Sequence, residues 1–174
     1  KCRELCNWKQ LEIKNIIKVI AHWMAIPLFL IFWIADLMNF QENKWQFLGI
    51  RMLIIPVCIL TIKLVQNASS LNYVQLIGSF YVLSTGGIIN LLIYNINDPA
   101  TNYYAGLNLV AIGGLSFVPF TLRYYIGSTI VLYLPYFLIT LPIAKNQDDY
   151  KIIATNSFFI VGSIVICFFI RFFN

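Results

Sequence analysis

The sequence is short of charge: only 11% of its 174 residues are Asp, Glu, Lys or Arg, whereas 60% are hydrophobic. A soluble domain of this length needs far more polar residues on its surface. The mean hydropathy of +0.77 points in the same direction. The low charge content therefore excludes an ordinary soluble domain and predicts an integral helical membrane protein.

The residue patterns that carry enzyme chemistry are also missing. His22 is the single histidine, so a haem held by two histidines cannot be built within this chain. No cluster of His, Asp and Glu has the spacing of a metal site, and there is no glycine-rich phosphate loop. We therefore expect no catalytic residue, metal or cofactor in this chain, and no nucleic acid partner.

What is present is a basic lead-in, residues 1–15, followed by six apolar stretches within residues 16–174. Each stretch has about 18 to 25 residues, which suits a hydrocarbon core of about 30 Å. The predicted fold is all-α, a bundle of six transmembrane helices, with kinks at Pro27, Pro56 and Pro135. The expected spans are Ile16–Met38, Phe47–Val65, Leu71–Asn95, Tyr103–Phe120, Tyr124–Leu141 and Ile152–Phe173.

The distribution of Lys and Arg predicts the orientation of these spans. One side of the membrane would carry Lys1, Arg3, Lys9, Lys14, Lys18, Lys63, Arg123 and Arg171. The other side would carry Lys44, Lys145 and Lys151, with Arg51 just inside the membrane. Because basic residues gather on the cytoplasmic side, both termini are expected in the cytoplasm.

Arg51 is the most informative single residue. It lies about 9 Å along the helix from Trp45, and a guanidinium at that depth needs a partner, water or a lipid headgroup. Asp36, Glu42 and Asp98 are all expected at the same outer boundary. Arg51 either pins the outer loops or snorkels to phosphates, or it anchors the polar end of a ligand.

Two neighbouring spans carry polar and small residues on one face each. A short turn near Asn97-Asp98, where Pro99 breaks the helix, favours antiparallel pairing of these spans. The two faces hold Ser84, Gly87, Asn90 and Tyr94 on one span and Tyr104 and Asn108 on the next, and Tyr133 on the fifth span could add a wall. Tyr136, on the same span as Tyr133, could add a further wall. Such faces either hold helices together or line a pocket for an amphipathic molecule with a polar head and an alkyl tail.

Three short segments resemble the six-span input module of bacterial membrane sensors. They are His22-Trp23-Met24-Ala25-Ile26-Pro27, the stretch from Glu42 to Arg51 (ENKWQFLGIR), and the stretch from Tyr103 to Val110 (YYAGLNLV) with Pro119 and Arg123 after it. The layout is similar to that of autoinducer-sensing histidine kinases and of the membrane anchors of nucleotidyl cyclases. The resemblance implies a location in the bacterial cytoplasmic membrane, cytoplasmic termini, a small hydrophobic signal, and a last helix that continues into an output domain. The 174 residues contain no kinase or cyclase domain, which departs from that pattern.

Three functional hypotheses follow. The first is a quorum-sensing type of receptor module that passes ligand binding through the sixth helix, with membrane lipids, a small hydrophobic ligand and further copies of the chain as partners. The second is a structural or assembly subunit of a larger membrane complex, favoured if Gly113, Gly114 or Gly162 points away from the bundle. The third is a small transporter or channel subunit, favoured if Gln75, Ser128 and Asn156 share one polar axis.

Overall fold

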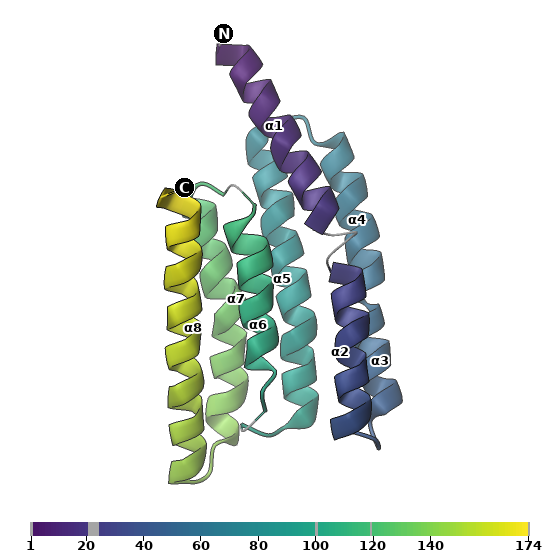
Figure 1. Ribbon diagram of the computed structural model, residues 1–174, viewed down its shortest axis with the longest axis vertical. Helices are drawn as coiled ribbons and strands as arrows, with labels where there is room; N and C mark the ends of the chain where they lie inside the picture. The colour runs from purple at the N-terminus through teal and green to yellow at the C-terminus, as the bar shows by residue number, and fades with distance from the viewer. Residues whose placement is uncertain (1, 21–24, 100, 119, 174) are drawn as a thin grey trace. The chain divides into compact units, whose positions relative to one another are not determined.

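The computed structural model describes residues 2–20, 25–99, 101–118 and 120–173, with side chains from residue 11 onward. The regular secondary structure of these residues is helical throughout, which confirms the all-α class (Figure 1). The helices are α1 (Cys2–Val19), α2 (Ile26–Asn39), α3 (Lys44–Met52), α4 (Ile54–Asn67), α5 (Leu71–Ile96), α6 (Tyr104–Ala111), the π-helix η2 (Ile112–Ser116), α7 (Leu122–Ile143) and α8 (Gln147–Phe173).

Four helical segments are long and apolar enough to cross a membrane. They are Lys44–Asn67, Leu71–Ile96, Leu122–Ile143 and Gln147–Phe173. Two further apolar helical segments, Ile26–Asn39 and Tyr104–Ser116, are shorter. By length and composition the chain is therefore an integral membrane protein. The expected spans starting at Phe47, Leu71, Tyr124 and Ile152 correspond to the four long segments.

The first expected span, Ile16–Met38, is not one described helix. The structure has α1 ending at Val19 and α2 beginning at Ile26, and residues 21–24 lie outside the described residues. Pro27 falls in the first turn of α2, where the missing N–H of proline has no intrahelical partner to lose. The lead-in boundary expected at residue 15 falls inside α1.

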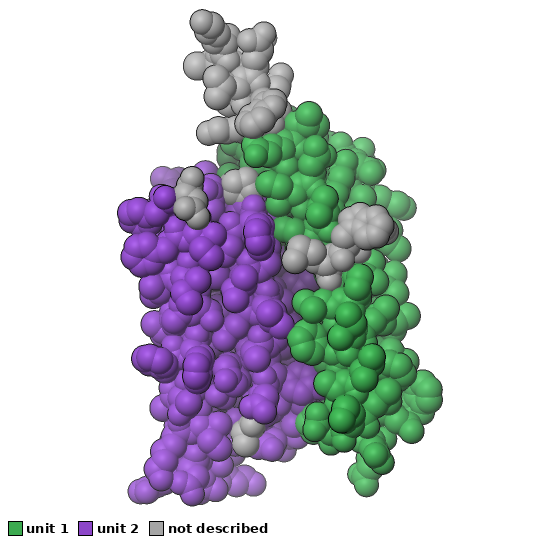
Figure 2. Space-filling model, viewed as in Figure 1, with its two compact units in different colours: residues 1–81 green, residues 82–174 purple. Residues whose placement is uncertain are grey.

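The chain divides into two compact units, residues 1–81 and residues 82–174 (Figure 2), and their boundary falls within α5. In the first unit α2 packs against α3, and α1 packs against α4. Ile13, Ile17 and Ile20 are buried, as expected for the apolar face of an amphipathic helix. The Nζ of Lys14 donates to the carbonyl oxygen of Ala68 at 2.6 Å.

The second expected span contains a local break. Leu53 separates α3 from α4, and its N–H bonds the carbonyl of Ile50, three residues back. Pro56 explains the position, because proline cannot bond the carbonyl four residues before it and its ring crowds that carbonyl, here the carbonyl of Met52. The helix is thus interrupted three residues before Pro56.

In the second unit α6, η2, α7 and α8 pack together (Figure 1). The last turn of α8 reaches the segment before α7, since the Nη2 of Arg171 donates to the carbonyl of Phe120 at 3.1 Å. Two glycines allow close approach. A Cβ on Gly86 would clash with Leu132 Cδ1, and a Cβ on Gly114 would lie 2.5 Å from Val82 Cγ2.

Candidate functional site

The polar contacts between helices of the second unit converge on one face of α7. Its hydroxyl-bearing residues recur every three or four positions, so they share a face. They extend from Tyr125 to Thr140, about 22 Å along the helix, which is most of the thickness of a hydrocarbon core. All are buried: Tyr125, Thr129, Tyr133, Tyr136 and Thr140. This α7 face, defined by these five residues, is the candidate site.

The α7 face bonds α6 through two of the residues predicted from the sequence. The hydroxyl of Tyr133 donates to the Oδ1 of Asn108 at 3.0 Å. Tyr133 is buried and Asn108 is half-buried. A phenol bonded to an amide inside an apolar bundle satisfies two groups that would be costly to leave unpaired.

Asn90 of α5 also reaches α7. Its Nδ2 donates to the carbonyl of Leu132 at 3.3 Å. Leu132 follows Val131, the residue whose carbonyl loses its helical partner because Pro135 has no backbone N–H. The Oδ1 of Asn90 is buried and has no hydrogen-bond partner among the described residues. Asn90 and Asn108 therefore both turn to α7 and do not bond each other.

The contacts between α7 and α8 involve Tyr136, which was predicted as a wall, and add Tyr125 and Asn156, which the predicted site did not contain. The Nδ2 of Asn156 donates to the hydroxyl of Tyr136 at 3.0 Å, and the hydroxyl of Tyr125 donates to the carbonyl of Ile164 at 2.9 Å. The spacing of Tyr and Thr along α7 is the signal in the sequence that identifies this face. The partner on α8 has no such signal, because periodicity within one helix does not say which neighbour it meets.

The remaining predicted residues of this unit are not gathered at the α7 face. Ser84 is half-buried and makes no hydrogen bond with a described residue. Gly87 is exposed, with no atom within 4 Å of the position that a Cβ would occupy, and Tyr94 is 64% exposed. The ring of Tyr104 lies 6.3 Å from the ring of Phe159 on α8. Of the predicted residues, Asn90, Asn108, Tyr133 and Tyr136 thus take part in hydrogen bonds that join α7 to a neighbouring helix.

Arg51 belongs to the first unit and is engaged there. Its Nε lies 2.6 Å from Asp36 Oδ2 and its Nη2 lies 3.0 Å from Asp36 Oδ1, a bidentate pair. Both residues are buried, at 5% and 2% exposure. The guanidinium also lies 5.9 Å from the ring centre of Phe32. Of the three carboxylates expected near Arg51, Asp36 is the one that pairs with it.

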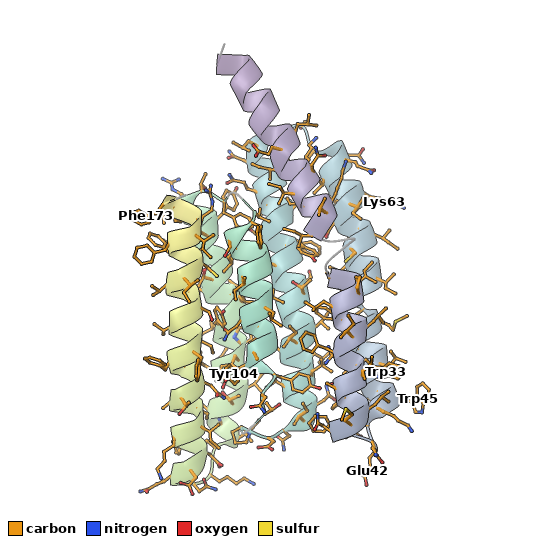
Figure 3. All side chains as sticks on the ribbon, viewed as in Figure 1. Trp33, Glu42, Trp45, Lys63, Tyr104 and Phe173 are labelled. Atoms are coloured by element: carbon orange, nitrogen blue, oxygen red, sulfur yellow. The ribbon has the colours of Figure 1, made fainter. Side chains whose placement is uncertain are left out.

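The hairpin of α2 and α3 also has contacts made by two tryptophans. The Nε1 of Trp33 donates to the carbonyl of Lys44 at 3.1 Å, and the rings of Trp33 and Trp45 are 6.2 Å apart. Figure 3 shows both tryptophans on one side of the hairpin and Glu42 at its tip. Glu42 is exposed. The ion pair between Arg51 and Asp36, together with the bond from Trp33 to Lys44, fixes the register of α2 against α3.

The polar groups of the α7 face are hydroxyls and amides, and the charged groups of the α2–α3 hairpin form an ion pair with each other. Groups of these kinds suit binding and packing. Among the described residues no group of three or more His, Cys, Asp or Glu could hold a metal ion.

The residues named for the two other hypotheses are placed as follows. The amide of Asn156 bonds Tyr136, and Ser128 lies in the same unit, whereas Gln75 lies in the other unit. Gly114 packs inward against Val82, while Gly113 and Gly162 have no atom within 4 Å of a Cβ position.

The segments that carry the resemblance to sensor input modules are described in part. Ala25-Ile26-Pro27 and the stretches from Glu42 to Arg51 and from Tyr103 to Val110 lie within the described residues, whereas His22-Trp23-Met24 and Pro119 do not. In comparisons with protein-family models, curated proteins and solved structures, nothing matches the chain. The resemblance therefore stays a prediction.

Proposed function

We propose that the chain is a membrane-embedded receptor module that binds a small hydrophobic or amphipathic signal and passes it through α8 to a cytoplasmic output domain. The observation that carries the proposal is the α7 face. It bonds Asn108 on one side, through Tyr133, and Asn156 on the other, through Tyr136. A ligand that changes the contact between α6 and α7 thereby acts on α7, which is also the helix bonded to α8.

The polar head of such a ligand would compete for the bond between Tyr133 and Asn108. The Oδ1 of Asn90, which has no partner among the described residues, would accept a hydrogen bond from a donor on the same head. A ligand shifts the bundle between two packings only by its difference in affinity for them, and a few kcal/mol is enough to switch an output. An alkyl tail would lie among the apolar side chains of the bundle.

We further propose six membrane crossings with both termini in the cytoplasm of a bacterial cell. Two contacts support the short helices as crossings. Lys14 bonds Ala68 after α4, while α2 meets α3 at the other end of the same unit. Arg171 in the last turn of α8 bonds the carbonyl of Phe120, which follows η2. The segment of α6 and η2 therefore ends at the same end of its unit as α8. The larger number of Lys and Arg residues on the side of the two termini supports this orientation.

Octanamide is a suitable probe because its amide offers both a donor and an acceptor on an alkyl chain. Spin labels at Gly127 on α7 and Phe169 on α8, both exposed, report the distance between the helices in reconstituted protein. In the labelled protein with no other substitution, octanamide should shift the distribution of distances between the two labels. The shift should be absent in Asn108→Ala.

Octane is the matched control, since it has the tail without the head. Equal shifts with octane and octanamide, or an unchanged shift in Asn108→Ala, would contradict the receptor proposal. Tyr94→Phe serves as the control variant, because Tyr94 is 64% exposed and makes no hydrogen bond with a described residue.

A structural or assembly subunit is the second candidate. It is favoured by the pairing of Arg51 with Asp36, which leaves the most conspicuous buried cation engaged within its own hairpin. In that case octanamide should move no label, and replacing Asn108 should change the stability of the bundle alone.

A further inference from the structure

A hollow lies between the loop after α5 and the loop before α8. Its volume is about 370 Å³, and it is lined by Asn97, Pro99, Pro142, Ile143, Lys145 and Asp149. All six residues belong to the second unit. Because α5 ends at Ile96 and α7 ends at Ile143, the hollow sits where two membrane-spanning helices leave the hydrocarbon core. That is the level of lipid headgroups.

The hollow presents both signs of charge. The backbone N–H groups of Lys145 and Asn146 donate to the Oδ2 of Asp149 at 2.8 and 3.3 Å. These bonds hold the carboxylate in place and leave its Oδ1 without a hydrogen bond from a described residue. The Nζ of Lys145 likewise makes no ion pair with a described residue. A lysine and an aspartate four residues apart therefore line one hollow.

The wall of the hollow continues into an apolar track. Pro142 lines the hollow, and Leu138 and Leu134 lie four and eight residues before it, on the same face of α7. Leu134 and Leu138 are 50% and 65% exposed. A molecule with its head in the hollow thus has an uncovered apolar surface along which an alkyl chain can lie.

We propose that this hollow binds the headgroup of a phospholipid with a primary ammonium, such as phosphatidylethanolamine. The lipid phosphate pairs with Lys145 and its ammonium pairs with the Oδ1 of Asp149, while one acyl chain follows Leu138 and Leu134. A choline headgroup cannot donate a hydrogen bond to the carboxylate, and a glycerol headgroup brings no positive charge. The pocket therefore distinguishes lipids by the ammonium.

The test uses the whole chain in nanodiscs that contain equal amounts of phosphatidylethanolamine, phosphatidylcholine and phosphatidylglycerol. Native mass spectrometry counts the lipids that stay bound. The wild-type protein should retain phosphatidylethanolamine preferentially, and Lys145→Gln should lower that retention about two- to fivefold, the factor that one exposed ion pair contributes. Lys151→Gln is the matched control, because Lys151 pairs with Asp148 and does not line the hollow.

Asp149→Asn separates the ammonium contact from the fold of the loop. The amide oxygen of Asn can still accept the two backbone N–H groups, so the start of α8 should persist while the preference for ethanolamine over choline falls. Circular dichroism and size exclusion verify folding, and Lys145→Gln carries the test if Asp149→Asn unfolds.

Three results would overturn the proposal. The first is equal retention in Lys145→Gln and wild type, and the second is retention of phosphatidylglycerol as strong as that of phosphatidylethanolamine. The third is displacement of the lipid by free phosphoethanolamine at an equal concentration, which would identify a site for a soluble molecule.

Discussion

Replacing Gly114 with alanine tests the packing of η2 against α5. The new Cβ would lie 2.5 Å from Val82 Cγ2, whereas carbon atoms in contact sit about 3.5 to 4.0 Å apart. Val82 must therefore retreat by about 1 Å, although it is fully buried and a valine in a helix is largely confined to one rotamer. Overpacking of this kind costs about 1 to 3 kcal/mol.

Gly113→Ala is the matched control, since a Cβ at Gly113 has no atom within 4 Å. Reversible unfolding in mixed detergent micelles measures both variants. Gly114→Ala should lower the free energy of unfolding by about 1 to 3 kcal/mol, and Gly113→Ala should not lower it. Adding Val82→Ala removes the methyl groups that clash, so the double variant should show a favourable coupling of about 1 kcal/mol or more. Equal stability of the two glycine variants would refute the packing argument.

Two further changes test buried polar contacts, with Tyr94→Phe as an exposed control that should leave stability unchanged. Asp36→Asn leaves the Arg51 guanidinium buried without its carboxylate and should cost about 3 to 5 kcal/mol, whereas the double variant Asp36→Leu with Arg51→Met should recover most of that loss; a double variant as unstable as the single one would contradict this reasoning. Tyr136→Phe leaves the amide of Asn156 without its partner and should lower the free energy of unfolding by about 1 to 3 kcal/mol in the same assay. A decrease no larger than that of Tyr94→Phe would show that this hydrogen bond does not stabilise the bundle.

Much of the helical layout is predictable because it depends on local properties. The chain leaves α5 at Asn97, which has a φ of 54°, just where Pro99 forbids a continued helix. Asparagine tolerates this left-handed conformation better than most residues. The apolar face of Ile13, Ile17 and Ile20 follows from helical spacing alone.

Partners across helices are less predictable, since they depend on the register between segments. The sequence leaves Asp36, Glu42 and Asp98 as partners for Arg51. Asp36 lies in the last turn of α2 and Arg51 in the last turn of α3, so only the packing of the two helices settles the choice. The bond between Asn156 and Tyr136 is unpredictable for the same reason.

The dependence of the second unit on α7 has a consequence for biosynthesis. Asn90 meets its backbone partner Leu132 only after 42 further residues have been made, which takes about 2 to 8 s at typical rates of synthesis. During that interval the amide of Asn90 has no α7 to bond, and the same holds for Asn108. We therefore expect α5 and α6 to wait beside the insertion machinery until α7 arrives, so that release into the lipid is delayed until all three helices are present.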